Sequence, residues 1–327
     1  MKKRKEEKMN EKVTAIITTH NRLEYLKKAI MSVKKQTYRN IEIIVVDDNS
    51  DSDTAEYCNN VEEIKYIKIK LEEHKNGNYA RNIGLRSANG KYVAFLDDDD
   101  EWLETKIEKQ VNILEKNVRL GAVYVTSIMD FNDGMYTYNN VADVELKGDC
   151  SKKCLYNIIT STSAIMFRKD ALEKIGGFDE NVNFWQDTEL VVRLCQEFDI
   201  DYIDEPLIIY RERFNDKKRL SNNIEGYKLA IEYINQKHKD IIDKLSDKEK
   251  KQRKVLIYND MAVRCAKKND MRNCRKYLYL SFKTIPSIKS FIKFLLNYTW
   301  IKKIKVLMEI QKYKSIKLIK NFEKLKE

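Results

Sequence analysis

The sequence lacks an apolar run long enough to cross a lipid bilayer. Its apolar runs, among them Ile41–Val46 and Phe294–Leu296, fall far short of the ~18 residues that a spanning helix needs. The first seven residues are basic at the start, but no apolar stretch follows them, which argues against a secretory signal. We therefore expect a cytoplasmic protein that could also lie peripherally on the inner face of the cell membrane.

The sequence also lacks a dense set of cysteines or histidines. Its six cysteines are scattered, at positions 58, 150, 154, 195, 265 and 274. Free thiols are the expected state in so long a chain. Cys150 and Cys154 have the spacing of half a zinc site, but no second Cys or His pair matches it, and His74 and His238 have no evident partners. These absences argue against a disulfide scaffold or a structural zinc protein.

Charge is distributed unevenly along the 327 residues, although the net charge is +11 at pH 7. Residues 1–210 contain 30 basic and 38 acidic side chains, whereas residues 211–327 contain 32 and 13. We therefore predict a basic N-terminal extension (1–11), a folded domain (12–215) and a basic helical C-terminal region (216–327).

Strand-like and helix-like patterns alternate through the first hundred residues. We predict buried strands at 13–18, 41–46, 64–69 and 92–96, with helices over 22–35, 53–59 and 79–88. Almost continuously apolar strands separated by helices are typical of a parallel sheet covered on both faces. The second half is more mixed, with strands expected at 122–128, 163–167 and 208–211 and a helix over 188–196.

Beyond residue 215 the pattern becomes lysine-rich and helical. We predict helices over 227–237, 251–267 and 271–283, followed by a basic stretch over 287–327. Within that stretch an apolar stripe includes Ile288, Phe291 and Ile292, then Ile304, Leu307 and Met308. The stripe has two interpretations, packing against neighbouring helices or association with a membrane surface.

Polar residues gather where the predicted strands end. They are Thr18–Asn21, Asp47–Asp48 and the four aspartates Asp97–Asp100. In an open parallel sheet this edge is where ligands bind. Four adjacent carboxylates at the exit of a buried strand would repel one another, and a hard divalent cation would relieve that repulsion. The alternative is a solvated acidic turn.

Several segments together resemble the family 2 glycosyltransferases, which have the GT-A fold, an α/β and mostly parallel Rossmann-like sheet flanked by helices. The resemblance covers residues 12–215. The matching segments are Ala15–Arg22, Ile43–Ser50, Ala80–Leu85, Gly90–Asp100 and Gly176–Asp187. It implies inverting transfer of a sugar from a nucleotide-diphosphate donor, usually a UDP-sugar, to a hydroxyl of a saccharide or lipid-linked acceptor in surface polysaccharide or glycoconjugate synthesis. We expect the basic helices to follow as an appendage.

The resemblance implies a donor site with Mn2+ or Mg2+ as cofactor. Asp99 would ligate the ion, and Asp97 would reach the ribose or the ion's water shell. Asp98 would lie among the nucleotide-sugar contacts, while Asp100 would support the loop. The remaining donor contacts implied by the family are Thr18, His20, Arg22, Asp48 and Arg81. Two alternatives are open: Asp48 as the N-cap of the next helix, and Arg81 as a surface salt bridge.

On the acceptor side the resemblance makes Asp187 the catalytic base, with a helix N-cap as its alternative. The family usually has Glu-Asp where this chain has Gln186–Asp187. Trp185 would line the acceptor site or pack in the core. The phosphate and acceptor candidates are Trp185, Gln186, Arg211 and Arg213, the last replacing a family histidine. Ser161–Ala164 would shape the donor and acceptor pockets.

Two other classes compete with this interpretation. A nucleotidyltransferase would normally carry a glycine-rich phosphate loop after the first strand, and Thr18–Arg22 contains no glycine. A non-enzymatic protein that binds nucleic acid or a membrane through its basic tail would leave Asp48, Asp97, Asp99 and Asp187 without a purpose. We therefore expect no nucleic-acid partner, and we expect an anionic membrane surface as a further partner of the basic region.

Overall fold

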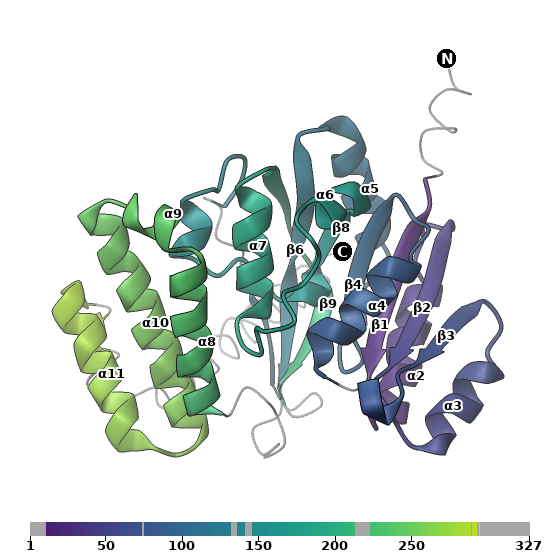
Figure 1. Ribbon diagram of the computed structural model, residues 1–327, viewed down its shortest axis with the longest axis horizontal. Helices are drawn as coiled ribbons and strands as arrows, with labels where there is room; N and C mark the ends of the chain where they lie inside the picture. The colour runs from purple at the N-terminus through teal and green to yellow at the C-terminus, as the bar shows by residue number, and fades with distance from the viewer. Residues whose placement is uncertain are drawn as a thin grey trace, which may run out of the picture.

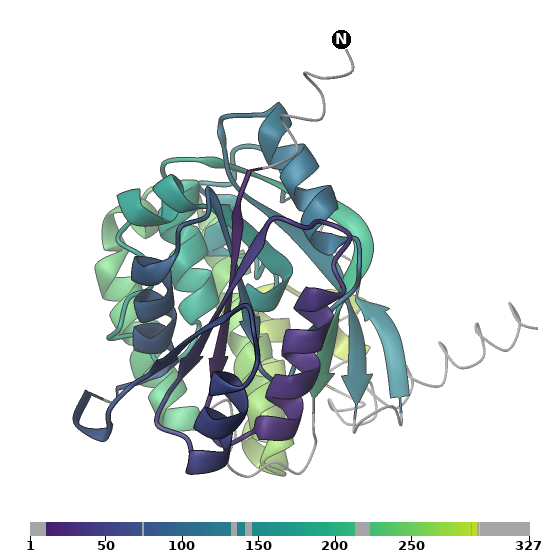
Figure 2. The same ribbon diagram turned by 90° about the vertical axis from the view of Figure 1, so that its right-hand side faces the viewer.

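A mixed β-sheet runs through the centre of the molecule, with helices on both faces (Figures 1 and 2). The computed structural model describes residues 11–73, 75–131, 136–140, 146–212, 223–288, 290–292 and 294. Within them nine strands form one sheet in the order β3-β2-β1-β4-β8-β6-β9-β5, and β7 pairs with β6. His74, Arg213 and the stripe positions Ile304, Leu307 and Met308 lie outside the described residues.

The first four strands are parallel, as the alternating pattern predicts. Their register places Thr18 of β1 beside Asp97 of β4 and Thr19 beside Asp47 of β2, so the polar residues that follow these strands meet at one edge. The elements of this half are β1 (Val13–Thr19), α2 (Leu23–Lys34), β2 (Ile41–Asp47), α3 (Ser52–Asn59), β3 (Ile64–Lys68), a 3-10 turn (Leu71–Glu73), α4 (Gly77–Ser87) and β4 (Tyr92–Asp97).

The second half of the sheet is mixed, because β8 is antiparallel to both β4 and β6 while β9 runs parallel to β6. Strand β9 is much longer than the predicted strand 208–211, and α5 is not predicted at all. The elements are β5 (Glu101–Trp102), α5 (Lys106–Lys116), β6 (Leu120–Phe131), β7 (Tyr136–Asn140), 3-10 turns (Lys153–Leu155 and Thr162–Ala164), β8 (Ile165–Arg168), α6 (Lys169–Lys174), α7 (Gln186–Cys195) and β9 (Asp199–Glu212).

Two hydrophobic cores lie on opposite faces of this sheet, because successive strand residues point to opposite sides. Ile16 belongs to the core that includes residues of α4 and α7. Its neighbours Ala15 and Ile17 belong to the core that includes residues of α2 and α5. Burying each large aliphatic side chain contributes roughly 1.5–3 kcal/mol. The sheet edge that carries the polar residues is therefore held by packing from both sides.

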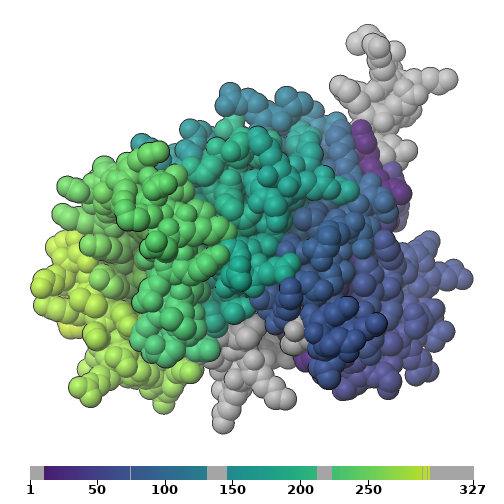
Figure 3. Space-filling model, viewed as in Figure 1, coloured from purple at the N-terminus to yellow at the C-terminus, as the bar shows by residue number. Residues whose placement is uncertain are grey.

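The C-terminal helices are α8 (Ile224–Lys237), α9 (Lys239–Asp243), α10 (Asp247–Lys267) and α11 (Met271–Thr284), and they form one side of the molecule (Figure 3). Side chains cap the N-termini of α8, α10 and α11. Asn223 accepts a hydrogen bond from the Gly226 amide, Ser246 and Glu249 form a capping box, and Asp270 accepts from the Asn273 amide. The predicted helices 227–237, 251–267 and 271–283 correspond to α8, α10 and α11. Within the described range, no helix combines the length and apolarity needed to cross a membrane.

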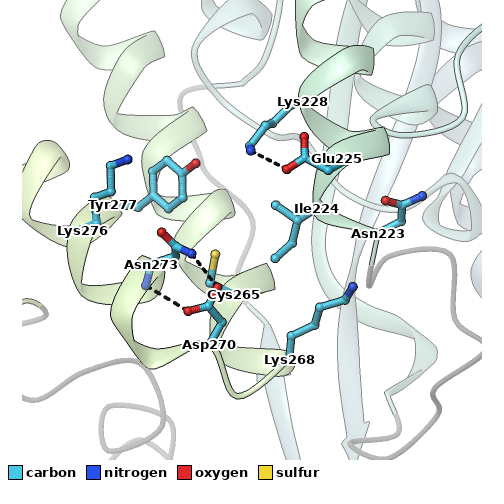
Figure 4. Close-up of a pocket in the computed structure, with 10 residues that line it drawn as sticks. All are labelled: Asn223, Ile224, Glu225, Lys228, Cys265, Lys268, Asp270, Asn273, Lys276 and Tyr277. Carbon is cyan, nitrogen blue, oxygen red and sulfur yellow. Dashed lines mark hydrogen bonds and ion pairs between the residues drawn. The ribbon is translucent and has the colours of Figure 1, made fainter.

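A third hydrophobic cluster joins these helices to the sheet domain. Phe184 and Trp185, which precede α7, pack with Tyr227 and Ile231 of α8 and Met261 of α10. Farther out, α8, α10 and α11 enclose a separate polar pocket of about 330 Å³, which none of the predicted site residues lines (Figure 4). The C-terminal helices are thus packed directly against the segment that leads into α7.

Candidate active site

The four aspartates at the end of β4 do not share one environment. The side chains of Asp97 and Asp99 are 31% and 17% exposed, whereas Asp98 and Asp100 are each only 1% exposed. The two accessible carboxylates alternate with the two buried ones. A solvated acidic turn does not describe this segment, because half of its carboxylates are inside the protein.

Asp98 is enclosed by the end of β1 and the start of α2. One carboxylate oxygen accepts hydrogen bonds from the Thr19 hydroxyl at 2.7 Å and from Arg22 Nε at 3.1 Å, and the other lies 2.5 Å from Arg22 Nη2. Burial raises the pKa of Asp98 to about 7, against the lowering effect of Arg22. Asp98 is thus held inside the turn by Thr19 and Arg22, and its nucleotide contact stays a prediction.

Arg22, one of the predicted donor contacts, pairs with two aspartates of the turn. Its guanidinium joins Asp98 to Asp99, with Nη1 at 2.9 Å from Asp99 Oδ2. The side chain remains 41% exposed. Arg22 thus balances the accessible carboxylate of Asp99 and could exchange this pairing for a bound ligand.

Asp100 and Arg211 hold the turn from inside. Asp100 Oδ1 accepts a hydrogen bond from the Arg211 amide at 3.2 Å, and burial together with repulsion from Asp99 and Asp97 raises the Asp100 pKa well above its usual value. The Arg211 guanidinium donates to the Asp99 carbonyl at 3.2 Å and to Glu101 at 2.6 Å. In this structure the Arg211 guanidinium binds the turn, and its role as a phosphate or acceptor contact stays a prediction.

The ends of β1 and β2 build the side of the site expected to hold the base and ribose. Asp47 is structural, since its carboxylate accepts from the Ser50 amide at 2.7 Å and from the Tyr66 hydroxyl at 2.6 Å. The backbone carbonyl of Asp48 accepts a hydrogen bond from His20 Nδ1 at 2.6 Å. Helix α3 takes Asp51 as its N-cap residue, so Asp48 does not cap that helix. Asp48 and His20 therefore lie together, and the half-buried Thr18 of β1 is paired in register with Val46 and Asp97.

Asp187 lies in the first turn of α7, one residue inside the helix, so it is not the N-cap residue. Its carboxylate accepts a short hydrogen bond from the buried Thr162 hydroxyl. Burial raises the Asp187 pKa above its usual value, and the nearby Arg81 cation opposes that effect. A carboxylate with a raised pKa and one fixed hydrogen bond fits the role of a general base.

Arg81 links the two acidic parts of the site. It is 6% exposed, its Nη2 lies 2.6 Å from Asp97 Oδ1, and its electrostatic partners include Asp187. Among the residues that the structure describes, its Nε has no hydrogen-bond partner. The surface salt-bridge alternative for Arg81 is therefore excluded. Arg81 is a buried cation between the Asp97 turn and the candidate base.

Trp185 and Gln186 connect the site to the C-terminal helices. Trp185 is 8% exposed, stacks edge-on against Tyr227 at 5.7 Å, and donates its indole N–H to Asp260 of α10 at 3.0 Å. These contacts favour core packing over the acceptor-lining alternative. Gln186 is the first residue of α7 and is half-buried.

Two residues of the 3-10 turn before β8 complete the site and are only loosely indicated by the sequence. Thr162 holds Asp187. Ser163 accepts from the Asp97 amide at 3.2 Å and also bonds the carboxylate of Asp100. The hydroxyl-rich run Ser161–Ala164 is the sequence signal, but which hydroxyl reaches which aspartate depends on how β8 pairs with β4.

The acidic turn has carboxylates suited to one mode of divalent-ion binding. Across the described ranges, no three His, Cys, Asp or Glu side chains surround a single point, which excludes an all-protein cage there. Asp97 and Asp99 instead offer two accessible carboxylates. Mg2+ and similar ions are commonly held by one or two carboxylates together with substrate phosphates and water. The residues present therefore fit an ion that binds together with a diphosphate.

Comparisons with known sequences agree with this geometry. The model of the family described as Glycosyl transferase family 2 matches residues 14–176. A GalNAc(5)-diNAcBac-PP-undecaprenol beta-1,3-glucosyltransferase of Campylobacter jejuni is 30% identical over 230 residues, which is 68% of this chain and 72% of that protein. The segment matched by the family model includes the acidic turn and most of the strands around it.

Solved structures support the fold. S. aureus TarS 1-349 in complex with UDP-GlcNAc superposes with a TM-score of 0.57 at 16% identity, covering 84% of this chain and 82% of that one. The mannosyltransferase PcManGT from Pyrobaculum calidifontis, in complex with GDP-Man and Mn2+, gives 0.52 at 15% identity, covering 91% and 84%. The GT-A fold class expected from the sequence is confirmed.

Proposed function

This protein belongs to glycosyltransferase family 2, and we propose that it transfers a sugar, with inversion, from a UDP-sugar to a hydroxyl of a lipid-linked saccharide. The arrangement of Asp97, Arg81 and Asp187 is the observation that carries this proposal. Arg81 pairs with Asp97 and interacts with Asp187, so a donor diphosphate at Asp97 and an acceptor hydroxyl at Asp187 would lie on either side of one buried cation. Sugar transfer needs both sites.

On the donor side, Asp99 and Asp97 would hold Mn2+ or Mg2+ together with the diphosphate. When bound, such an ion neutralises the negative charge that develops as the nucleotide leaves. Arg81 and the 41% exposed Arg22 supply fixed positive charge at the same place. Asp48 would accept hydrogen bonds from the base, because a carboxylate complements a base edge that carries donors.

On the acceptor side, Asp187 would remove the hydroxyl proton as the acceptor oxygen forms its bond to the anomeric carbon. The bond from that carbon to the diphosphate oxygen breaks on the opposite face, and the electron pair leaves with UDP. Thr162 fixes the direction of the carboxylate. Burial raises the pKa of Asp187, which strengthens it as a base, while the nearby Arg81 cation favours its ionised form.

Two relatives suggest the substrates. TarS was solved with UDP-GlcNAc, and the Campylobacter jejuni relative is named for an undecaprenol-diphosphate acceptor. These names support a UDP-sugar donor and an acceptor carried on a polyprenyl diphosphate. Glucosyl and N-acetylglucosaminyl transfer are the two donor classes to test first.

The C-terminal helices would bring the protein to an anionic membrane, where such an acceptor lies. Helix α11 contains Arg272, Arg275, Lys276 and Lys283 and no acidic residue. Just beyond it, the side chains of Ile288, Phe291 and Ile292 are 81%, 45% and 45% exposed. Basic residues close to an anionic surface contribute up to ~1 kcal/mol each, and exposed apolar side chains can enter the headgroup boundary.

The test is a thermal-shift panel of UDP, GDP and CDP, each with and without Mn2+. We expect UDP to raise the melting temperature only when the ion is present, and Asp99→Ala to abolish that shift. Asp204→Ala, at an exposed aspartate of β9, is the matched control and should leave the shift intact. A protein that none of the three nucleotides stabilises would contradict the proposal.

A further inference from the structure

Two residues flank the candidate base at equal distance along the chain, and both are bound by C-terminal helices. Trp185 lies two residues before Asp187, and Glu189 lies two residues after it. Trp185 contacts α8 and α10, while Glu189 contacts α8. The first turn of α7 is therefore clamped on both sides of Asp187 by segments that lie outside the matched family region.

The Trp185 anchor includes an unusual backbone conformation. Trp185 has φ 57° and ψ 26°, the left-handed region that a bulky side chain rarely adopts. Such a conformation persists only where surrounding contacts enforce it. Here the indole is buried against Tyr227 and donates to Asp260, which is also paired with Arg264 at 3.2 Å. The backbone turn that directs Gln186 and Asp187 toward the site thus depends on α8 and α10.

The Glu189 anchor is a buried ion cluster. Glu189 is 1% exposed, and Arg193 of the same helix binds its carboxylate through two hydrogen bonds of 2.8 and 2.7 Å. Lys237 Nζ, at the end of α8, lies 2.8 Å from the same carboxylate, and Nε2 of His238, the residue between α8 and α9, lies 3.2 Å from it. Lys237 also reaches Asp179, at 2.5 Å, in the loop before α7.

These partners hold the Glu189 pKa below its usual value despite the burial, with His238 and Arg193 contributing most. A carboxylate buried this deeply stays charged only while its cations remain in place. Removing Lys237 would leave the buried Glu189 carboxylate with less positive charge around it, in the first turn of α7. That turn would then shift to bring Glu189 toward water or toward other partners.

We propose that the C-terminal helices position the catalytic base, with Trp185, Glu189 and Lys237 as positioning residues that act through Asp187. This inference rests on the proposed role of Asp187. It assigns to α8 and α10 a part in sugar transfer that is separate from membrane binding. A misplacement of about 1 Å at a reacting group can cost about 100-fold in rate, so a loosened α7 should lower kcat.

The kinetic test compares three substitutions on one helix. Lys237→Met should lower kcat about 10- to 100-fold and leave the donor KM within about twofold, because the donor site lies on other elements. Lys237→Arg, which keeps the cation, should retain most of the activity. Lys228→Met is the matched control, since Lys228 also lies on α8 but pairs with Glu225 at the exposed surface. Equal kcat values for Lys237→Met and Lys228→Met would overturn the proposal.

Hydrogen exchange provides a readout that needs no activity. We expect Lys237→Met to speed exchange of the α7 amides, residues 189–195, at least tenfold, while β1 and β4 keep their wild-type protection. Trp185→Phe, which removes the indole hydrogen bond to Asp260 and part of the ring packing but keeps an aromatic side chain, should have a smaller effect in the same direction. Unchanged α7 protection in both variants would overturn the proposal. A wild-type protein without transferase activity would instead overturn the proposed function, and the exchange result would still decide whether α8 holds α7.

Discussion

The carboxyl edge of the sheet and the C-terminal helices use charge in opposite ways. At the sheet edge, several acidic groups are buried and bound by particular donors, as Asp98 is by Thr19 and Arg22. On the outer helices, charges are mostly exposed, as in the Lys228–Glu225 pair, and α11 carries only basic ones. Buried charges depend on exact partners, whereas exposed charges act together as a field.

This difference predicts a division of labour that experiments can separate. Nucleotide binding and chemistry should respond to single changes at the sheet edge. Membrane association should respond to the number of basic residues on the helices and to salt. The two regions meet at the Glu189–Lys237 cluster. There a lysine of a C-terminal helix forms an ion pair with a buried carboxylate, as residues at the sheet edge do.

The largest effect is expected from Asp187→Asn, which removes the carboxylate of the proposed base but keeps its shape. We expect kcat to fall about 10²- to 10⁴-fold, the usual contribution of a general base. Binding of UDP with Mn2+ should be retained, as measured by calorimetry. Turnover equal to that of the wild type would show that Asp187 is not the base and that another group at the sheet edge takes the proton.

Arg81→Met tests whether the buried cation is as important to stability as its partners suggest. Without it, Asp97 and Asp187 lose a shared neighbour, and breaking a buried pair typically costs about 3–5 kcal/mol of unfolding free energy. Urea unfolding measures the loss. Lys27→Met, which breaks an exposed pair with Glu24, is the control and should change the unfolding midpoint very little. Similar midpoints for both variants would contradict the buried role of Arg81.

Asp98 should make the stability of the metal-free protein depend on pH. Its folded pKa is raised to about 7 by burial, so the stability that its protonated form contributes is complete below the unfolded pKa of ~3.9 and is lost as the pH rises toward 7. Asp98→Asn removes this dependence. Relative to the wild type, the variant should therefore gain stability between pH 4 and pH 7, by up to ~1.4 kcal/mol per pKa unit.

The matched control for this pH series is Asp243→Asn. Asp243 is exposed and paired with Lys239, which lowers its pKa, so its contribution changes only in more acidic solution. Its stability difference from the wild type should stay constant from pH 5 to pH 8. A similarly flat difference for Asp98→Asn would show that the Asp98 carboxyl is ionised at neutral pH.

The smallest effect concerns the membrane. Replacing Arg272 and Arg275 of α11 with glutamine should weaken binding to vesicles that contain phosphatidylserine by about tenfold at low salt, since each basic residue contributes up to ~1 kcal/mol. Donor KM should not change. The control replaces Lys28 and Lys116, two exposed lysines of the sheet domain, with glutamine. If both pairs weaken vesicle binding equally, net charge alone is responsible and α11 is not the docking face.

The sequence predicts the first four strands well, because they are short, almost wholly apolar and punctuated by polar turns. It does not predict most of β9, whose 14 residues include Asp199, Asp201, Asp204 and Glu205 and so have no clear alternation. It also does not predict α5, although Ile107, Val111 and Leu114 recur at helical spacing. Helices with lysine and glutamate between apolar positions are easily overlooked next to stronger motifs.

The sequence by itself determined the reaction type, because the order and spacing of its motifs identify the family and single out Asp99 and Asp187. Only the tertiary structure decided the environments. Four identical neighbours, Asp97 to Asp100, differ because the turn directs two toward solvent and two toward Thr19 and Arg211. Likewise, Glu189 acquires its role from Lys237, 48 positions further along the chain. A local pattern can specify which groups are present, but burial and partners come from segments that meet only after folding.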